Sequence, residues 1–317
     1  MARKIERIEY SGWPNCFRVS NGKIELIVTG DVGPRIIRLG FDGGRNFFHE
    51  VRHELGGSGE PDFRLRGGHR VWAAPENLLT SWAPDNSAVE VAVRAGVLEA
   101  TAPVEPATRL QKQLVIRMAA SAARVEVVHR IRNANPWAVE VASWAMSVMA
   151  PGGVAVTGFP PRGEHPQALQ PTNPLVMWAY TDFSDPRWAF CKKYLLLRQD
   201  PERPAPLKVG LFNPRTWAAY MLGSDLFLKQ AQADPLQPYP DFGSSLEMFT
   251  NGDMLELETL GPLVKLAPNA WTEHTEHWSL HRNVSASNEG EIEKLIEPLL
   301  GDPFDFYRAV GGKLAPA

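Results

Sequence analysis

The segment "DMLELETLGP" (residues 253–262) carries two carboxylates at a spacing that could support acid–base chemistry. Side chains on a strand alternate between two faces, so Glu256 and Glu258 would lie next to each other on one face. Two neighbouring carboxylates on a largely buried strand raise each other's pKa, and a carboxylate with a raised pKa can act as a general base. The alternative is a half-exposed strand whose polar face contacts solvent.

A second candidate is "GGHRVWAAPE" (residues 67–76). His69 titrates near neutral pH and can donate or accept a proton, and the planar fork of Arg70 could hold hydroxyl groups or a phosphate. The two preceding glycines would let the backbone turn sharply and approach a ligand. The alternative is a turn that enters a strand, with a hydrogen-bonded histidine.

Three histidines follow in "EHTEHWSLH" (residues 273–281), where an H-x-x-x-H spacing would place two ligands on one side of a helix. The flanking Thr and Trp residues predict a strand instead, which puts His277 and His281 on one face and His274 on the other. We therefore favour a terminal strand with polar positions and expect no metal site. The two cysteines, Cys16 and Cys191, have no disulfide framework or metal spacing.

Strands predominate among the elements that must position these residues. Period-two and β-branched runs predict strands at residues 23–30, 35–41, 89–96, 109–119, 123–133, 138–150, 175–181, 193–199, 207–212, 217–223, 226–232, 245–251, 253–261 and 271–282. A helix is predicted at about residues 288–300, capped by Ser287 or Asn288. Closely spaced strands with almost no helices between them indicate an all-β antiparallel sandwich, which we take as a single domain over residues 1–317. The Pro/Gly-rich stretch 151–174 is interpreted as a long surface loop.

The composition of the chain limits the classes of binding partner that we expect. The net charge of −3 offers no basic field for nucleic acid or an anionic membrane. The charged N-terminus has no apolar signal segment, and no run of about 18 apolar residues occurs, so we expect a cytoplasmic protein. Ten tryptophans are present, and Trp can pack on sugar rings or simply fill a core. Neither a nucleophile elbow nor a phosphate-binding glycine motif is found.

Four segments, in order, resemble the galactose-mutarotase-like superfamily, which includes aldose 1-epimerases and hexose-6-phosphate mutarotases. They are "NGKIELIVTGDVGPRIIRLGFDGGRNFF", "GGHRVW", "IRNANPWAVEVASWAMSVMAPGG" and "LELETLGPLVKLAPNAWTEHTEHWSL". The similarity spans about residues 20–282. It implies a large antiparallel β-sandwich with one short C-terminal helix and a concave face that holds sugars.

The resemblance also implies roles for single residues. The family's catalytic glutamate falls on Glu258 and its first histidine on His69, whereas the position of its second histidine falls on Trp144. Residues 67–76 would then form a loop at the rim of the cleft. The substrate-binding residues would be Arg70, Trp72, Glu76, Lys208, Asp241, Glu247 and Glu256. That chemistry needs neither a metal nor a cofactor.

The leading functional hypothesis is therefore an aldose 1-epimerase-like enzyme that acts on a small-molecule carbohydrate. Glu258 would take the proton of the anomeric hydroxyl while His69 protonates the ring oxygen. One alternative is a non-catalytic carbohydrate-binding protein, which the missing second histidine favours. Another is a lyase or isomerase of acidic sugars, in which Arg70 and Lys208 bind a carboxylate.

Overall fold

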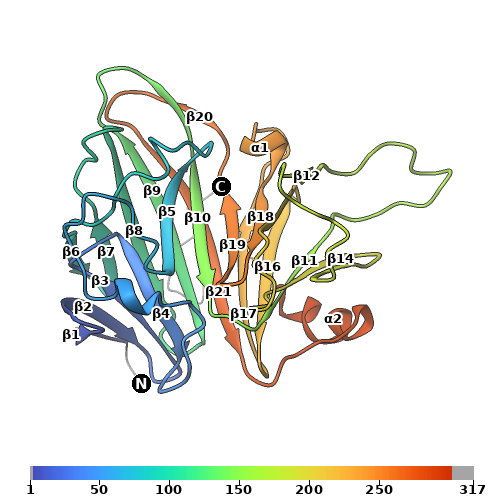
Figure 1. Cartoon of the computed structure of the whole chain (residues 1–317), viewed down its shortest axis with the longest axis horizontal. Coiled ribbons are helices and arrows are strands. Elements are labelled where there is room, and N and C mark those ends of the chain that lie inside the picture. Colours follow the sequence, from blue (N-terminus) through green and yellow to red (C-terminus); the bar gives the residue numbers. More distant parts are fainter. Residues whose placement is uncertain (1–2, 302–317) are drawn as a thin grey trace.

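Two large antiparallel sheets face each other in the computed structural model, which describes residues 3–301 (Figure 1). The first sheet has eleven strands in the order β1-β2-β3-β4-β5-β10-β19-β18-β15-β12, with β20 paired to β10. The second has ten in the order β13-β14-β11-β16-β17-β21-β9-β8-β7-β6. This arrangement confirms the predicted all-β sandwich.

The strands of the first sheet are β1 (Lys4–Tyr10), β2 (Trp13–Ser20), β3 (Ile24–Thr29), β4 (Arg35–Phe41), β5 (Gly68–Ala74), β10 (Val139–Met149), β12 (Leu175–Met177), β15 (Leu207–Leu211), β18 (Leu246–Thr250), β19 (Leu255–Leu260) and β20 (Val264–Leu266). Those of the second are β6 (Glu90–Arg94), β7 (Val97–Thr101), β8 (Leu110–Met118), β9 (Arg124–Asn133), β11 (Val154–Gly158), β13 (Trp188–Phe190), β14 (Tyr194–Arg198), β16 (Arg215–Leu222), β17 (Asp225–Gln232) and β21 (Trp271–His281).

Helices are few and short. They are α1 (Pro240–Gly243), α2 (Glu289–Leu295) and the 3-10 turns η1 (Arg52–Glu54) and η2 (Glu297–Leu299). The side chain of Asn288 accepts a hydrogen bond from the Glu291 backbone N–H, as the predicted cap requires. The predicted helix at 288–300 breaks after Leu295 because Pro298 has no N–H to continue it. Within the described residues, no helix is long and apolar enough to cross a bilayer.

The main core lies between the two sheets. It contains Val71, Met149 and Leu257 from the first sheet, packed against residues of the second such as Leu114 and Trp278. These positions alternate with residues of the opposite face, so β5, β10 and β19 each present one face to the core and the other away from it. The outer face of the first sheet carries a second apolar cluster of Trp72, Ala74, Ala142, Trp144, Met146 and Leu260.

Two expectations about loops are corrected. Residues 68–74 form β5, a strand buried along its whole length in the middle of the first sheet, and not a rim loop. The alternation of side chains within it therefore decides which face each residue reaches. The stretch 151–174 contains β11 after a short turn, and β11 pairs with both β14 and β16. Only the part after residue 158 forms the long loop that extends from the right of Figure 1.

Candidate functional site

A cavity of about 370 Å³ opens on the outer face of the first sheet, away from the core between the sheets. Aromatic rings make up much of its wall, and charged side chains lie among them. The lining residues are Phe63, Leu65, Arg70, Trp72, Glu76, Trp82, Trp144, Met146, Trp178, Tyr180, Pro206, Lys208, Phe249, Met254 and Glu256.

Strand register explains why these residues meet. Arg70, Met146, Glu258 and Glu247 form one continuous row across β5, β10, β19 and β18. Residues in register on neighbouring strands share a face, so the row places a guanidinium and two carboxylates on the cavity side of the sheet. The prediction that Glu256 and Glu258 share a face is confirmed by the same pairing.

Lys208 links two of these carboxylates. Its Nζ lies 2.9 Å from Glu258 Oε2 and 2.8 Å from Glu247 Oε2, and it sits 4.7 Å from the centre of the Trp144 ring. Burial alone would lower the pKa of Lys208, but the two carboxylates outweigh it and raise that pKa well above the usual value. Burial, together with the charge of Glu258, raises the pKa of Glu247. The cluster therefore holds one ammonium and favours keeping a proton on Glu247.

Trp144 occupies the position where the resemblance implies a second histidine. Its indole Nε1 donates a 2.9 Å hydrogen bond to Glu258 Oε2, the oxygen that also accepts from Lys208. Glu258 is fully buried and is not among the residues that line the cavity. It therefore reaches the cavity only through Lys208 and Trp144, whereas the resemblance implies direct contact with a substrate.

Glu256, unlike Glu258, lies on the cavity wall itself. Burial, and next the charge of Glu258, raises the pKa of Glu256 from 4.5 to about 7. Such a group is partly protonated and partly ionised at neutral pH, so it can either accept or donate a proton there. Glu256 is therefore the candidate acid–base group on the cavity wall.

His69 does not reach this cavity. It is the residue before Arg70 on β5, so its side chain points to the opposite face, into the space between the sheets. Its Nε2 lies 2.6 Å from His129 Nε2 on β9 of the second sheet, and its Nδ1 lies 2.8 Å from Ser147 Oγ. The predicted pairing of His69 with Glu258 in one hollow is therefore corrected.

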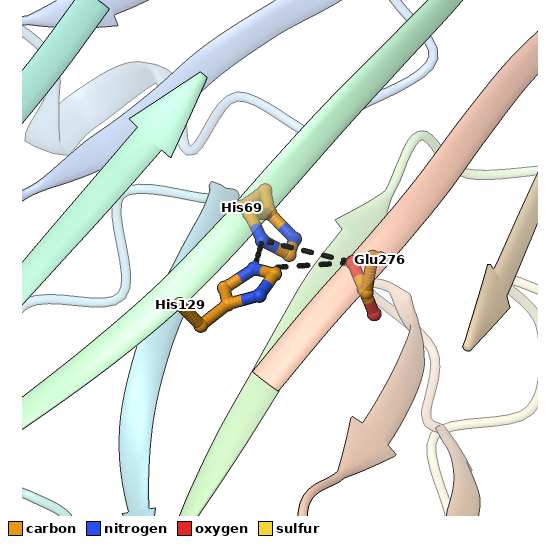
Figure 2. Close-up of side chains that lie close together, drawn as sticks. All are labelled: His69, His129 and Glu276. Carbon is orange, nitrogen blue, oxygen red and sulfur yellow. Dashed lines mark hydrogen bonds and ion pairs between the residues drawn. The ribbon is translucent and has the colours of Figure 1, made fainter. Parts of the chain in front are cut away.

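Figure 2 shows where His69 does lie, beside His129 and Glu276. The carbonyl of His274 can only accept a hydrogen bond, so His129 Nδ1 carries the proton and His129 Nε2 accepts from His69. Glu276 pairs with Lys229 at 2.6 Å. Burial lowers the pKa of His69 well below its usual value and lowers the pKa of His129 to about 3, so both rings stay neutral.

These three residues also offer a possible metal-ligand set, with two imidazole nitrogens and one carboxylate oxygen within 4.8 Å of one another. A tetrahedral zinc ion, with Zn–N bonds of about 2.0–2.1 Å, would hold two nitrogens about 3.3 Å apart. The observed 2.6 Å is a hydrogen bond, and Lys229 already neutralises Glu276. The arrangement therefore fits an internal hydrogen-bond network better than a metal centre. His274 joins this network on β21, and its neighbours His277 and His281 lie in the same strand, as predicted.

The other predicted residues divide into two groups. Arg70, Trp72, Glu76, Lys208 and Glu256 line the cavity, and Glu247 lies directly behind Lys208. Asp241 lies outside the lining, near enough for its charge to help raise the pKa of Glu247. Sequence reasoning missed the aromatic residues Phe63, Trp82, Trp178, Tyr180 and Phe249, of which the first four come from loops. The excess of tryptophan was the one signal of an aromatic wall.

Comparison with known proteins agrees on the fold. The structure resembles a galactose mutarotase-like protein from Lactobacillus casei (10% identity, 84% of this chain and 100% of that chain, TM-score 0.54). It also resembles a galactose mutarotase related enzyme from Lactobacillus acidophilus (9%, 86% and 100%, 0.55) and a galactose mutarotase-like protein from Clostridium acetobutylicum (10%, 89% and 99%, 0.51). The sequence matches no protein-family profile and no curated protein. The chain therefore has the galactose mutarotase-like fold. Sequence identities this low support a likeness of fold and nothing more.

Proposed function

We propose that the protein binds a sugar in the cavity on the outer face of the first sheet and interconverts its anomers. The observation that carries the proposal is Glu256, a carboxylate on the cavity wall whose pKa is raised to about 7. The aromatic wall supports it, because flat apolar rings pack on the C–H faces of sugars while charged groups bind hydroxyls. The likeness of the fold to galactose mutarotase-like proteins agrees with a sugar ligand.

In the proposed reaction, ionised Glu256 takes the proton from the anomeric hydroxyl. The C1–O1 bond becomes a carbonyl as the bond between C1 and the ring oxygen breaks, and Lys208 gives a proton to the ring oxygen. Rotation about C1–C2 and closure on the other face of the carbonyl, with both proton transfers reversed, yield the other anomer. The ring oxygen leaves as an alkoxide, which is a stronger base than an amine. Lys208 can therefore protonate this alkoxide even though the pKa of Lys208 is raised.

Glu258 has a positioning role in this proposal. Its Oε2 accepts hydrogen bonds from both Lys208 and Trp144, which holds the ammonium on the floor of the cavity. This assignment replaces the pair of Glu258 and His69, because His69 lies on the other face of the sheet.

The test is NMR exchange spectroscopy of anomer interconversion with a panel of aldoses and acidic sugars, each compared with the uncatalysed rate. We expect acceleration for at least one sugar and a large loss in Glu256→Gln. Glu258→Gln should retain part of the activity, because it disturbs Lys208 without removing the base. If no sugar is accelerated, the enzymatic proposal fails.

One observation favours a second candidate, a non-catalytic carbohydrate-binding protein. Trp144 occupies the position where the resemblance implies a catalytic histidine. Its indole N–H donates a hydrogen bond to Glu258, so this position has no imidazole that could donate a proton to the sugar. Calorimetry separates the two candidates: sugar binding without any anomer exchange would support the binding protein.

A further inference from the structure

We infer that the sugar bound in this cavity carries a carboxylate, which pairs with Arg70. The inference rests on the proposed function, since it names the class of ligand for the same cavity. Hexuronates are the simplest sugars of this kind.

Arg70 differs from the other buried cations of the described chain, because each of the others forms an ion pair. Among the arginines, Arg35 pairs with Asp85, Arg66 with Glu60 and Arg187 with Asp185. The buried lysines are paired too: Lys112 with Glu105, Lys208 with Glu247 and Glu258, and Lys229 with Glu276. Arg70 is only 2% exposed, yet within residues 3–301 it forms no ion pair with a carboxylate. Asp85, Glu256 and Glu258 act on Arg70 by their charge, but none of them forms an ion pair with it. A buried charge without a counter-ion in contact is costly, so this position favours one from outside the chain.

The contacts that Arg70 does make are weak. Its Nη1 lies 3.5 Å from the Leu65 carbonyl oxygen and its Nη2 lies 3.4 Å from Met146 Sδ, while Nε has no hydrogen-bond partner. These distances are at the outer limit for hydrogen bonds or involve a weak acceptor. The N–H groups of a guanidinium that lines the cavity are therefore free to turn to a better acceptor.

Aromatic rings hold the guanidinium in place without using its donors. The centre of the Arg70 guanidinium is 4.2 Å from the Trp72 ring centre and 4.9 Å from the Phe63 ring centre. Stacking on ring faces leaves the donors at the edge of the guanidinium available for a bidentate bond. A carboxylate matches that planar fork, whereas a neutral hydroxyl can satisfy only part of it.

Charge balance favours a carboxylate over a phosphate. Lys208 is already neutralised by Glu258, so Arg70 is the one lining cation of the described chain that forms no ion pair with a carboxylate. One guanidinium balances a carboxylate, whereas a phosphate close to dianionic at neutral pH would leave excess negative charge beside Glu256.

The experiment is calorimetric titration with glucose, glucuronate, the methyl ester of glucuronate and glucose 6-phosphate, repeated with galactose and galacturonate. We expect at least one uronate to bind 10-fold or more tightly than its parent aldose and its ester. In Arg70→Met that uronate should lose about 10- to 150-fold in affinity, the range for losing a hydrogen bond to a charged group. The parent aldose should lose less affinity than the uronate, because its hydroxyls use only part of the fork, so the preference for the uronate should largely disappear in Arg70→Met. Arg70→Lys should fall between wild type and Arg70→Met, because Lys keeps the charge but not the fork.

A thermal unfolding comparison without ligand separates a binding role from a structural one. Arg66→Met is the matched control, because Arg66 is a fully buried arginine paired with Glu60. We expect Arg66→Met to lower Tm by several degrees and Arg70→Met to leave it unchanged or higher. An equal fall in both variants would assign Arg70 a structural role and overturn the inference.

Equal affinity for a uronate and its parent aldose would also overturn it, as would a preference for glucose 6-phosphate. In either case, accelerated anomer exchange of the favoured sugar would leave the proposed function standing. If no member of the panel binds, the proposed function fails together with the inference.

Discussion

The pKa of Glu256 gives the sharpest test of the proposed chemistry. With a pKa of about 7, this carboxylate is ionised to about one tenth at pH 6, one half at pH 7 and nine tenths at pH 8. A reaction that needs the ionised form should therefore show a rise in kcat/KM of about tenfold between pH 6 and pH 8 and level off above. A carboxylate with its ordinary pKa would give a flat profile over the same range, because it would already be ionised.

The assay is anomer exchange measured by NMR at a series of pH values, with the uncatalysed rate subtracted at each pH. The inflection in the plot of kcat/KM against pH reports the pKa of the essential base in the free protein. Glu256→Gln is expected to reduce kcat/KM by about 10²–10⁴-fold, the usual contribution of a positioned base, and to abolish the inflection near pH 7.

Glu258→Gln provides the control for the electrostatic argument. The charge of Glu258 is one cause of the raised pKa of Glu256, so its removal should move the inflection to lower pH while leaving the base in place. A wild-type profile that is flat from pH 6 to 8, or full activity in Glu256→Gln, would refute the assignment of Glu256 as the base.

Four further outcomes are expected. Because burial and Glu258 raise the pKa of Glu256 from 4.5 to about 7 on folding, this group lowers stability as pH rises through that window; Glu256→Gln should thus add about 3 kcal/mol to the free energy of unfolding at pH 8, by urea denaturation, and almost nothing at pH 4. Lys229→Met leaves Glu276 buried without its counter-ion and should cost about 3–5 kcal/mol in the same assay; a loss below about 1 kcal/mol would contradict the pairing. His129 has its pKa lowered to about 3 by burial, so its contribution is intact above pH 6.5 and about 2 kcal/mol is lost by pH 5; His129→Gln should be less sensitive to acid by that amount. Sugar binding should change the tryptophan fluorescence, and Trp82→Phe should reduce the change, because this ring lines the cavity and is 41% exposed.

The features that the sequence predicted correctly are those set by neighbouring residues: strand alternation, turns and helix caps. The alternation of Glu256 and Glu258 with leucines predicted both the strand and their shared face, because the side-chain period of a strand is two. The hairpin between β18 and β19 was also predictable from its turn residues. The side-chain Oδ1 of Asn251 accepts hydrogen bonds from the backbone N–H groups of Asp253 and Met254. The cap at Asn288 is a local feature of the same kind.

The sequence by itself determined an all-β sandwich, the faces of its strongly alternating strands and the presence of acid–base groups in β19. Only the tertiary structure decided that His69 lies between the sheets and Arg70 in the cavity, because β5 is buried on both faces and its sequence has no apolar–polar alternation to mark the inner one. It also decided that Lys208 neutralises Glu258, which is 50 positions away in the chain, and that loop aromatics complete a wall whose residues run from Phe63 to Glu256. A pattern with a period of two residues cannot encode such distances; the pairing order of the strands does.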